Sequence, residues 1–139
     1  MCIRDSTNNG SITLNDFVIS GNALQTINGY GSIRNLLMFH FGPGLHLNGD
    51  QTITNFLNFN YGGMTTSATN KLIIGPNATV QNNSGTQNYI NGNLEMYYNT
   101  GYPSLLFRIG DNAGYRPVEI GFVNVTSPGS ILMRTFNSD

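Results

Sequence analysis

The residues that could do acid–base chemistry are few and widely spaced. Seven of the 139 residues are acidic, and glycoside hydrolysis, for example, needs two carboxylates that face one bond. No two of them are close enough in sequence to share a strand face. Pairing between coils could bring some together, for example Asp16 and Asp50, but the residues around these two are typical of turns rather than of strand centres. We therefore predict no catalytic residue in this chain. The carboxylates considered are those of Asp16, Asp50, Glu95, Asp111, Glu119 and Asp139.

Two histidines form the other candidate site. His40 and His46 flank residues 41–45 and could hold a metal ion as a pair. A zinc site needs three or four ligands at recognised spacings, and the sequence supplies no third ligand. We therefore expect each ring to face solvent or to bond to the backbone. The sequence also lacks glycine-rich phosphate loops and the calcium-binding nonapeptide, and we predict neither a metal nor a cofactor.

Three tyrosines, Tyr97, Tyr98 and Tyr102, could stack on sugar rings. Aromatic side chains on adjacent strands more often pack where two parts of a protein meet, and we favour that interpretation. Four Asn-x-Ser/Thr sequons are expected by chance in a chain so rich in Asn, Ser and Thr. These sequons begin at Asn9, Asn77, Asn82 and Asn124.

The amino-acid composition excludes several classes of protein. Asn, Gly, Thr and Ser make up more than two fifths of the chain, whereas charged residues make up 9% and the net charge is −1. Six basic residues cannot form the clustered positive surface that binds nucleic acid or an anionic membrane. The longest apolar run, 36–39, is far shorter than the roughly 20 residues of a membrane-spanning helix. Leu, Ile, Val and Phe still make up more than a quarter of the chain, enough for a folded core.

The local pattern favours strands over helices. Leu is common, but the other good helix formers, Ala, Glu and Lys, are rare in this chain. Apolar residues alternate with polar ones over 57–61, 94–98 and 105–109, which is typical of strands. Asn-Gly turn dipeptides begin at Asn9, Asn28, Asn48 and Asn91. The predicted class is all-β.

The turn residues recur with a period near 20. Asn9, Asn28, Asn48, Asn70 and Asn91 follow one another at intervals of 19 to 22. Repeats of this length with one or two strands each predict a solenoid, and we expect a right-handed parallel β-helix. In such a fold Asn amides bond from coil to coil at the corners, and Ile53, Leu72 and Leu94 stack within one bore. Antiparallel hairpins with Asn-Gly turns are the alternative. The apolar stretches that follow the Asn positions are 10–14, 31–36, 51–57, 71–74 and 93–96.

The pattern divides the chain into three parts. Residues 1–6 resemble translated adapter sequence, and we set them aside together with Cys2, the only cysteine. Residues 7–100 carry the repeats. Residues 101–139 are expected to begin a truncated antiparallel, β-sandwich-like module, because longer strands are predicted over 104–109, 117–125 and 130–136. We expect a fragment of a longer protein, with an open end coil that promotes aggregation.

Several segments resemble a known group of proteins. Residues 48–54, 62–66 and 70–80 resemble the coils of large repetitive bacterial surface proteins exported by the type IX secretion system. Residues 89–94, 107–111 and 115–118 are similar to the junction of β-helix and β-sandwich-like module in those proteins, although Arg108 stands where they usually have Pro.

The resemblance implies an extracellular or outer-surface location and a non-enzymatic adhesive or scaffolding role. Polysaccharides or other cell-surface ligands are the implied partners, and a sorting domain would lie further along the parent protein. The alternative is a fragment of a carbohydrate-active β-helix enzyme, a polysaccharide lyase or hydrolase, whose active site lies elsewhere.

Overall fold

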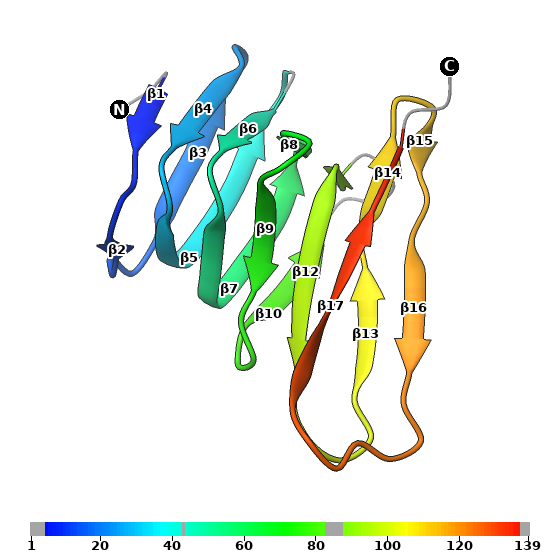
Figure 1. The fold of residues 1–139 in the computed structure, drawn as a ribbon. Coiled ribbons are helices and arrows are strands. Elements are labelled where there is room, and N and C mark those ends of the chain that lie inside the picture. Colours follow the sequence, from blue (N-terminus) through cyan, green and yellow to red (C-terminus); the bar gives the residue numbers. More distant parts are fainter. Residues whose placement is uncertain (1–4, 43, 83–87, 137–139) are drawn as a thin grey trace.

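A computed structural model describes residues 5–42, 44–82 and 88–136. The described residues form strands and turns and contain no helix, which confirms the predicted all-β class. The strands wind into a stack of three-sided coils, with β1 at one end of the stack and β15, β16 and β17 at the other (Figure 1). The predictions made for Cys2 and Asp139 concern residues outside the described ranges.

One side of the coils is a seven-stranded sheet, which we call the first wall. Its strands pair in parallel from β1 to β14, and only the last strand, β15, runs antiparallel. Asp5 and Ser6, which the sequence analysis set aside, pair here with Thr26 and Ile27. The strands are β1 (Asp5–Thr7), β4 (Gln25–Asn28), β6 (Leu45–Asn48), β8 (Met64–Thr66), β11 (Ile90–Asn91), β14 (Ile109–Asp111) and β15 (Gly114–Tyr115).

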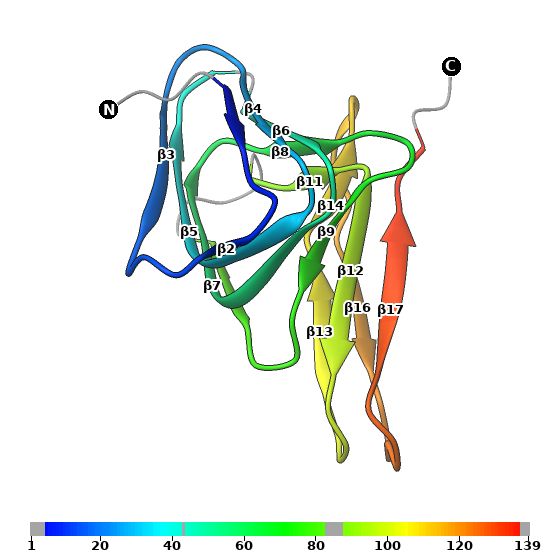
Figure 2. The same cartoon turned by 60° about the vertical axis from the view of Figure 1, so that its left-hand side comes forward.

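An eight-stranded sheet forms the other two sides, because its two longest strands turn a corner (Figure 2). The first half of β5 pairs with β2 and its second half with β3; likewise β7 pairs first with β9 and then with β10. The second wall consists of β2, β9, β12, β17 and the first halves of β5 and β7. The third wall consists of β3, β10 and the second halves of β5 and β7. The strands are β2 (Ser11–Ile12), β3 (Phe17–Gly21), β5 (Gly31–His40), β7 (Gln51–Tyr61), β9 (Lys71–Ile74), β10 (Thr79–Asn82), β12 (Asn93–Tyr98) and β17 (Gly129–Arg134).

The register confirms the predicted period and solenoid. Paired positions of the first wall differ in number by 19 to 21, except in one coil where they differ by 26, and the stack has about five turns. Each of the five apolar stretches contributes a strand to the eight-stranded sheet. Leu72 pairs with Leu94 as expected, but Ile53 pairs with Ile74 and not with Leu72, because the register between β7 and β9 lies two residues from the expected one; all three are in the same apolar core. The register pairs are Asp5–Thr26, Gln25–Leu45, Leu45–Met64, Met64–Ile90 and Ile90–Ile109.

The three walls enclose one apolar core. Alternate residues point inward in strands such as β4, β6 and β9, and burying one large aliphatic side chain contributes about 1.5–3 kcal/mol to folding. The bore is continuous from coil to coil, since neighbouring strands place apolar residues in line. Its fully buried members include Ile27, Ile33, Leu36, Met38, Leu45, Leu47, Ile53, Leu57, Phe59, Met64, Leu72 and Ile90.

Asparagine amides connect neighbouring coils at the corners, as predicted. The amide of Asn48 donates to the side-chain oxygen of Asn28 at 3.0 Å. A second ladder, which the sequence analysis did not single out, runs along the corner between the second and third walls. There Asn55 donates to the side-chain oxygen of Asn35 at 2.7 Å, and Asn35 donates to the carbonyl of Asn15. Such bonds hold the coils in register because each joins residues one coil apart.

The antiparallel strands after residue 100 cover the last coil. β13 (Ser104–Phe107) pairs with β16 (Val118–Gly121), whereas β17 pairs with β12 and not with β16. These strands therefore do not form one antiparallel sheet of their own. Strand β12 ends the parallel part of its sheet, and β17 covers its free edge with Met133 opposite Leu94 and Ile131 opposite Met96. The strand predicted over 104–109 is split, because its end, β14, joins the first wall.

Candidate functional site

His40 is a buried structural residue. Its side chain is 1% exposed, and Nε2 donates to the carbonyl of Ala23 at 2.8 Å. Nδ1 accepts the backbone N–H groups of Gly42 and Gly44, at 3.1 and 3.2 Å. Since a carbonyl cannot donate and two N–H groups cannot accept, the ring is the neutral tautomer with its proton on Nε2. This bears out the expectation that His40 bonds to the backbone.

Replacing this ring should be costly. His40→Ala leaves two N–H groups and one carbonyl without partners and opens a cavity, so we expect the free energy of unfolding to fall by about 3 kcal/mol. His46→Ala is the matched control, because His46 is half-buried and bonds through Nδ1 to Thr65 Oγ1 at 2.9 Å. That variant should lose about 1 kcal/mol or less. Urea unfolding measures both, and equal losses would contradict the structural role of His40.

The two histidines do not come together. His40 is buried at the end of β5, whereas the ring of His46 bonds to Thr65 of the neighbouring strand β8. Within the described ranges, no group of three or more His, Cys, Asp or Glu residues could hold a metal ion.

The carboxylates are also held apart. Asp16 precedes β3 and Asp50 precedes β7, so they lie at different corners of the coil. Asp50 accepts the backbone N–H of Lys71 at 2.9 Å. Glu119 accepts the hydroxyl of Ser104 at 3.1 Å. These contacts are local and structural.

Asp111 and Arg116 form an ion pair beside β15. Arg116 Nε lies 2.8 Å from Asp111 Oδ2, and Asp111 Oδ1 accepts the N–H of Ala113 at 2.8 Å. Desolvation raises the pKa of the Asp111 carboxyl, but the Ala113 N–H and the Arg116 guanidinium outweigh it and hold the pKa below its usual value. The pair fixes the turn between β14 and β15.

A partly buried ion pair joins three strands of the second wall. Glu95 of β12 contacts the ammonium of Lys71 on β9 and accepts the hydroxyl of Ser130 on β17 at 2.6 Å. Burial raises the pKa of Glu95, but the bonds from Lys71 and Ser130 outweigh it and hold the pKa below the ordinary 4.5. The hydrogen bond to Glu95 raises the pKa of Lys71 above 10.5. The pair therefore favours the charged form of both groups.

This pair predicts a pH-dependent contribution to stability. Glu95 has a lowered pKa, so its contribution is complete above 4.5 and disappears as the pH falls through the lowered value; that of Lys71 is complete below 10.5. We expect Glu95→Gln to lower the free energy of unfolding by about 1 kcal/mol at pH 7. The difference between the two proteins should vanish in acid, below the pKa that Glu95 has in the folded protein. Urea unfolding across this range measures it, and a difference independent of pH would refute the assignment.

The three tyrosines have different environments. The ring of Tyr98 packs against Phe122, with ring centres 4.9 Å apart, where β12 meets the antiparallel strands. This agrees with the interpretation of junction packing. Tyr97 and Tyr102 are exposed, at 42% and 79%, so the structure does not gather the three into one platform.

A different pair of aromatic rings is exposed on neighbouring coils. Phe41 and Tyr61 stack with ring centres 4.8 Å apart, and they are 71% and 46% exposed. The sequence analysis missed this pair. The available signal was the spacing, since each aromatic residue precedes a glycine and one period of the repeat separates the two. The pair presents apolar surface at the corner between the third and first walls.

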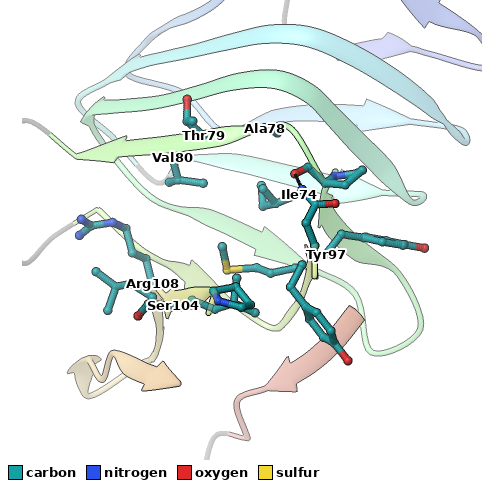
Figure 3. A pocket seen from close by; sticks show the side chains of 14 residues that line it. Ile74, Ala78, Thr79, Val80, Tyr97, Ser104 and Arg108 are labelled. Atoms are coloured by element: carbon teal, nitrogen blue, oxygen red, sulfur yellow. Dashed lines mark hydrogen bonds between the residues drawn. The ribbon is translucent and has the colours of Figure 1, made fainter. Parts of the chain in front are cut away.

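The third wall is split at its last coil. Strand β13 follows β12 along the chain, as β10 follows β9, but it pairs with β16 and not with β10. A cleft of about 410 Å³ separates β10 from β13. Figure 3 shows Ile74 and Val80 on one side of the cleft and Ser104 and Arg108 on the other. Polar and apolar side chains line it together, and the apolar ones include the core residues Ile74 and Leu105 and the partly buried Val80 and Met96.

Arg108 stands at this cleft, and no carboxylate among the described residues pairs with it. It is half-buried, and its Nη1 donates to the hydroxyl of Tyr115 at 3.2 Å. The ion pairs found among the described residues join Lys71 to Glu95 and Arg116 to Asp111. The sequence analysis noted this arginine only as a departure from the pattern of similar proteins, because the split depends on pairing between distant strands.

Within the described part of the chain, no helix is long and apolar enough to cross a membrane. No family model, curated protein or solved structure matches the chain. The chain is therefore characterised by its fold, a β-solenoid of about five turns.

Proposed function

We propose that this chain is a stalk section of a secreted bacterial surface protein, with an adhesive or scaffolding role and no catalysis of its own. The observation that carries the proposal is the continuous parallel pairing from β1 to β14. Each coil is bonded to the next through backbone and corner amides, so a force applied at one end passes through every coil. Solenoids of this kind are stiff along their axis and offer extended surfaces for repeated weak contacts.

Two observations on side chains support this role. The carboxylates that could form an acid–base pair lie at separate corners or in separate ion pairs, including those of Glu95 and Asp111. The exposed stack of Phe41 and Tyr61 offers ring faces to the C–H groups of a sugar, because the face of an aromatic ring is electron-rich. Polysaccharides are therefore the proposed partners.

Frontal affinity chromatography on the immobilised chain tests binding and turnover together. Xylan, pectin, alginate and hydroxyethyl cellulose are passed over the column, and both the delay and the length of each polymer are measured. We expect at least one polymer to emerge delayed and intact. The delay should disappear with the double variant Phe41→Ala, Tyr61→Ala and persist with Tyr102→Ala, whose ring is exposed elsewhere. Shortened polymer in the eluate would favour the enzyme alternative.

A further inference from the structure

The split in the third wall leaves two strand edges facing each other. Strand β10 is bonded to β7 along one edge, and β13 is bonded to β16 along one edge. Among the described strands, none pairs with the other edge of either one. An unpaired edge presents N–H and C=O groups that can bond to an added strand. From this geometry we propose that the split binds an extended peptide segment of another protein, which pairs with β10 and carries an acidic side chain for Arg108.

The floor of the cleft favours a peptide over a sugar. Ile74 and Leu105 belong to the apolar core, and the partly buried Val80 and Met96 pack against it. A sugar hydroxyl placed over Ile74 or Leu105 would lose its hydrogen bonds to water and find no partner in these side chains, which is costly. An extended peptide instead satisfies its backbone at the strand edge and directs alternate side chains into the apolar floor. The occupant should therefore have apolar residues at every second position.

The dimensions fit a short strand. A cleft of about 410 Å³ lies within the range of roughly 300–1,000 Å³ that is typical of ligand sites. The four residues of β10 extend over about 13 Å, at about 3.3 Å per residue. A matching segment of four to six residues would add one strand to the third wall and fill the split between β10 and β13.

Arg108 is the reason why we expect the bound segment to carry a negative charge. Within the described ranges its guanidinium donates to the neutral hydroxyl of Tyr115, and a guanidinium has further donors for a carboxylate. A carboxylate pairs with a guanidinium through two parallel bonds, which are stronger than bonds between neutral groups. A glutamate or aspartate at one end of the bound segment would reach this group.

NMR titration of the ¹⁵N-labelled chain tests the inference with defined probes. The probes are end-capped peptides of three Thr-Val repeats, carrying Glu at the first or at the last position, and the same peptides with Gln. We expect shifts of the β10 and β13 amides, and at least one Glu peptide should bind about tenfold tighter than its Gln counterpart. Arg108→Gln should remove this tenfold preference. The matched control Arg34→Gln should keep it, because Arg34 is exposed and bonds to Asn15 at a distant corner.

Three results would overturn the inference. They are no shift of β10 or β13 at several millimolar peptide, equal affinity of the Glu and Gln peptides for the wild-type chain, and displacement of the peptide by alginate as the tighter ligand. The comparison on the wild-type chain remains decisive even if Arg108→Gln does not fold. The inference is independent of the proposed stalk role, since Arg108→Gln should leave polysaccharide retention on the affinity column unchanged.

Discussion

Gly44→Ala should lower the free energy of unfolding by about 3 kcal/mol or more, because a left-handed residue and a steric overlap combine at this corner. Gly44 has a φ of +91°. A Cβ added there would lie 2.2 Å from the carbonyl oxygen of Gly63 in the next coil. That oxygen accepts the N–H of Leu45 at 3.2 Å, so the neighbouring coil cannot move away without breaking the parallel ladder. Chemical denaturation measures the loss.

Two other glycines separate the causes of this effect. Gly114 has a φ of +133°, and a Cβ there would meet no atom within 4 Å, so Gly114→Ala should cost only about 1–2 kcal/mol. Gly10 has neither a positive φ nor a neighbour within 4 Å, and Gly10→Ala should be close to neutral. If Gly44→Ala and Gly114→Ala lowered the free energy of unfolding by similar amounts, the close contact with Gly63 would not be the reason for glycine at position 44.

Phe59→Ala should destabilise the protein by about 3–5 kcal/mol, because it empties a large volume in the middle of the bore. Phe59 is fully buried on β7, and Met38 of β5 lies beside it in register. Thermal or urea unfolding measures the effect.

The matched control is Phe39→Ala, on the next strand of the same wall. Phe39 points outward and is 37% exposed, so truncation should cost about 1 kcal/mol or less. A comparable loss for Phe39 and Phe59 would contradict the assignment of the inner and outer faces of the third wall.

Much of the solenoid could be predicted because its signals are local and repeated. The Asn-Gly dipeptides at Asn28 and Asn48 mark one corner, and the apolar stretches after them form the second wall. The same periodicity correctly placed Leu72 beside Leu94 but missed the register of Ile53, which lies beside Ile74. The corner ladder of Asn15, Asn35 and Asn55 was equally periodic in the sequence, but it lacks the glycines that drew attention to the first corner.

The last coil and the cleft could not be predicted in the same way. Strand β13 has the alternation of a wall strand, and nothing local to it indicates that it pairs with β16 rather than β10. The pairing of β17 with β12 joins segments much further apart in sequence than one coil and has no repeated pattern. The role of His40 depends on the carbonyl of Ala23 from the preceding coil, a contact that only the folded stack creates.

Single-molecule pulling from the two ends of the chain tests the proposed load-bearing stack most directly. Because each coil is bonded chiefly to its neighbours, we expect stepwise release of single coils, and each step of about 20 residues should lengthen the chain by about 70 Å. Gly44→Ala should lower the force of at least one step. Release of the whole chain in one event, or extension at negligible force without steps, would contradict a stalk built from successive coils.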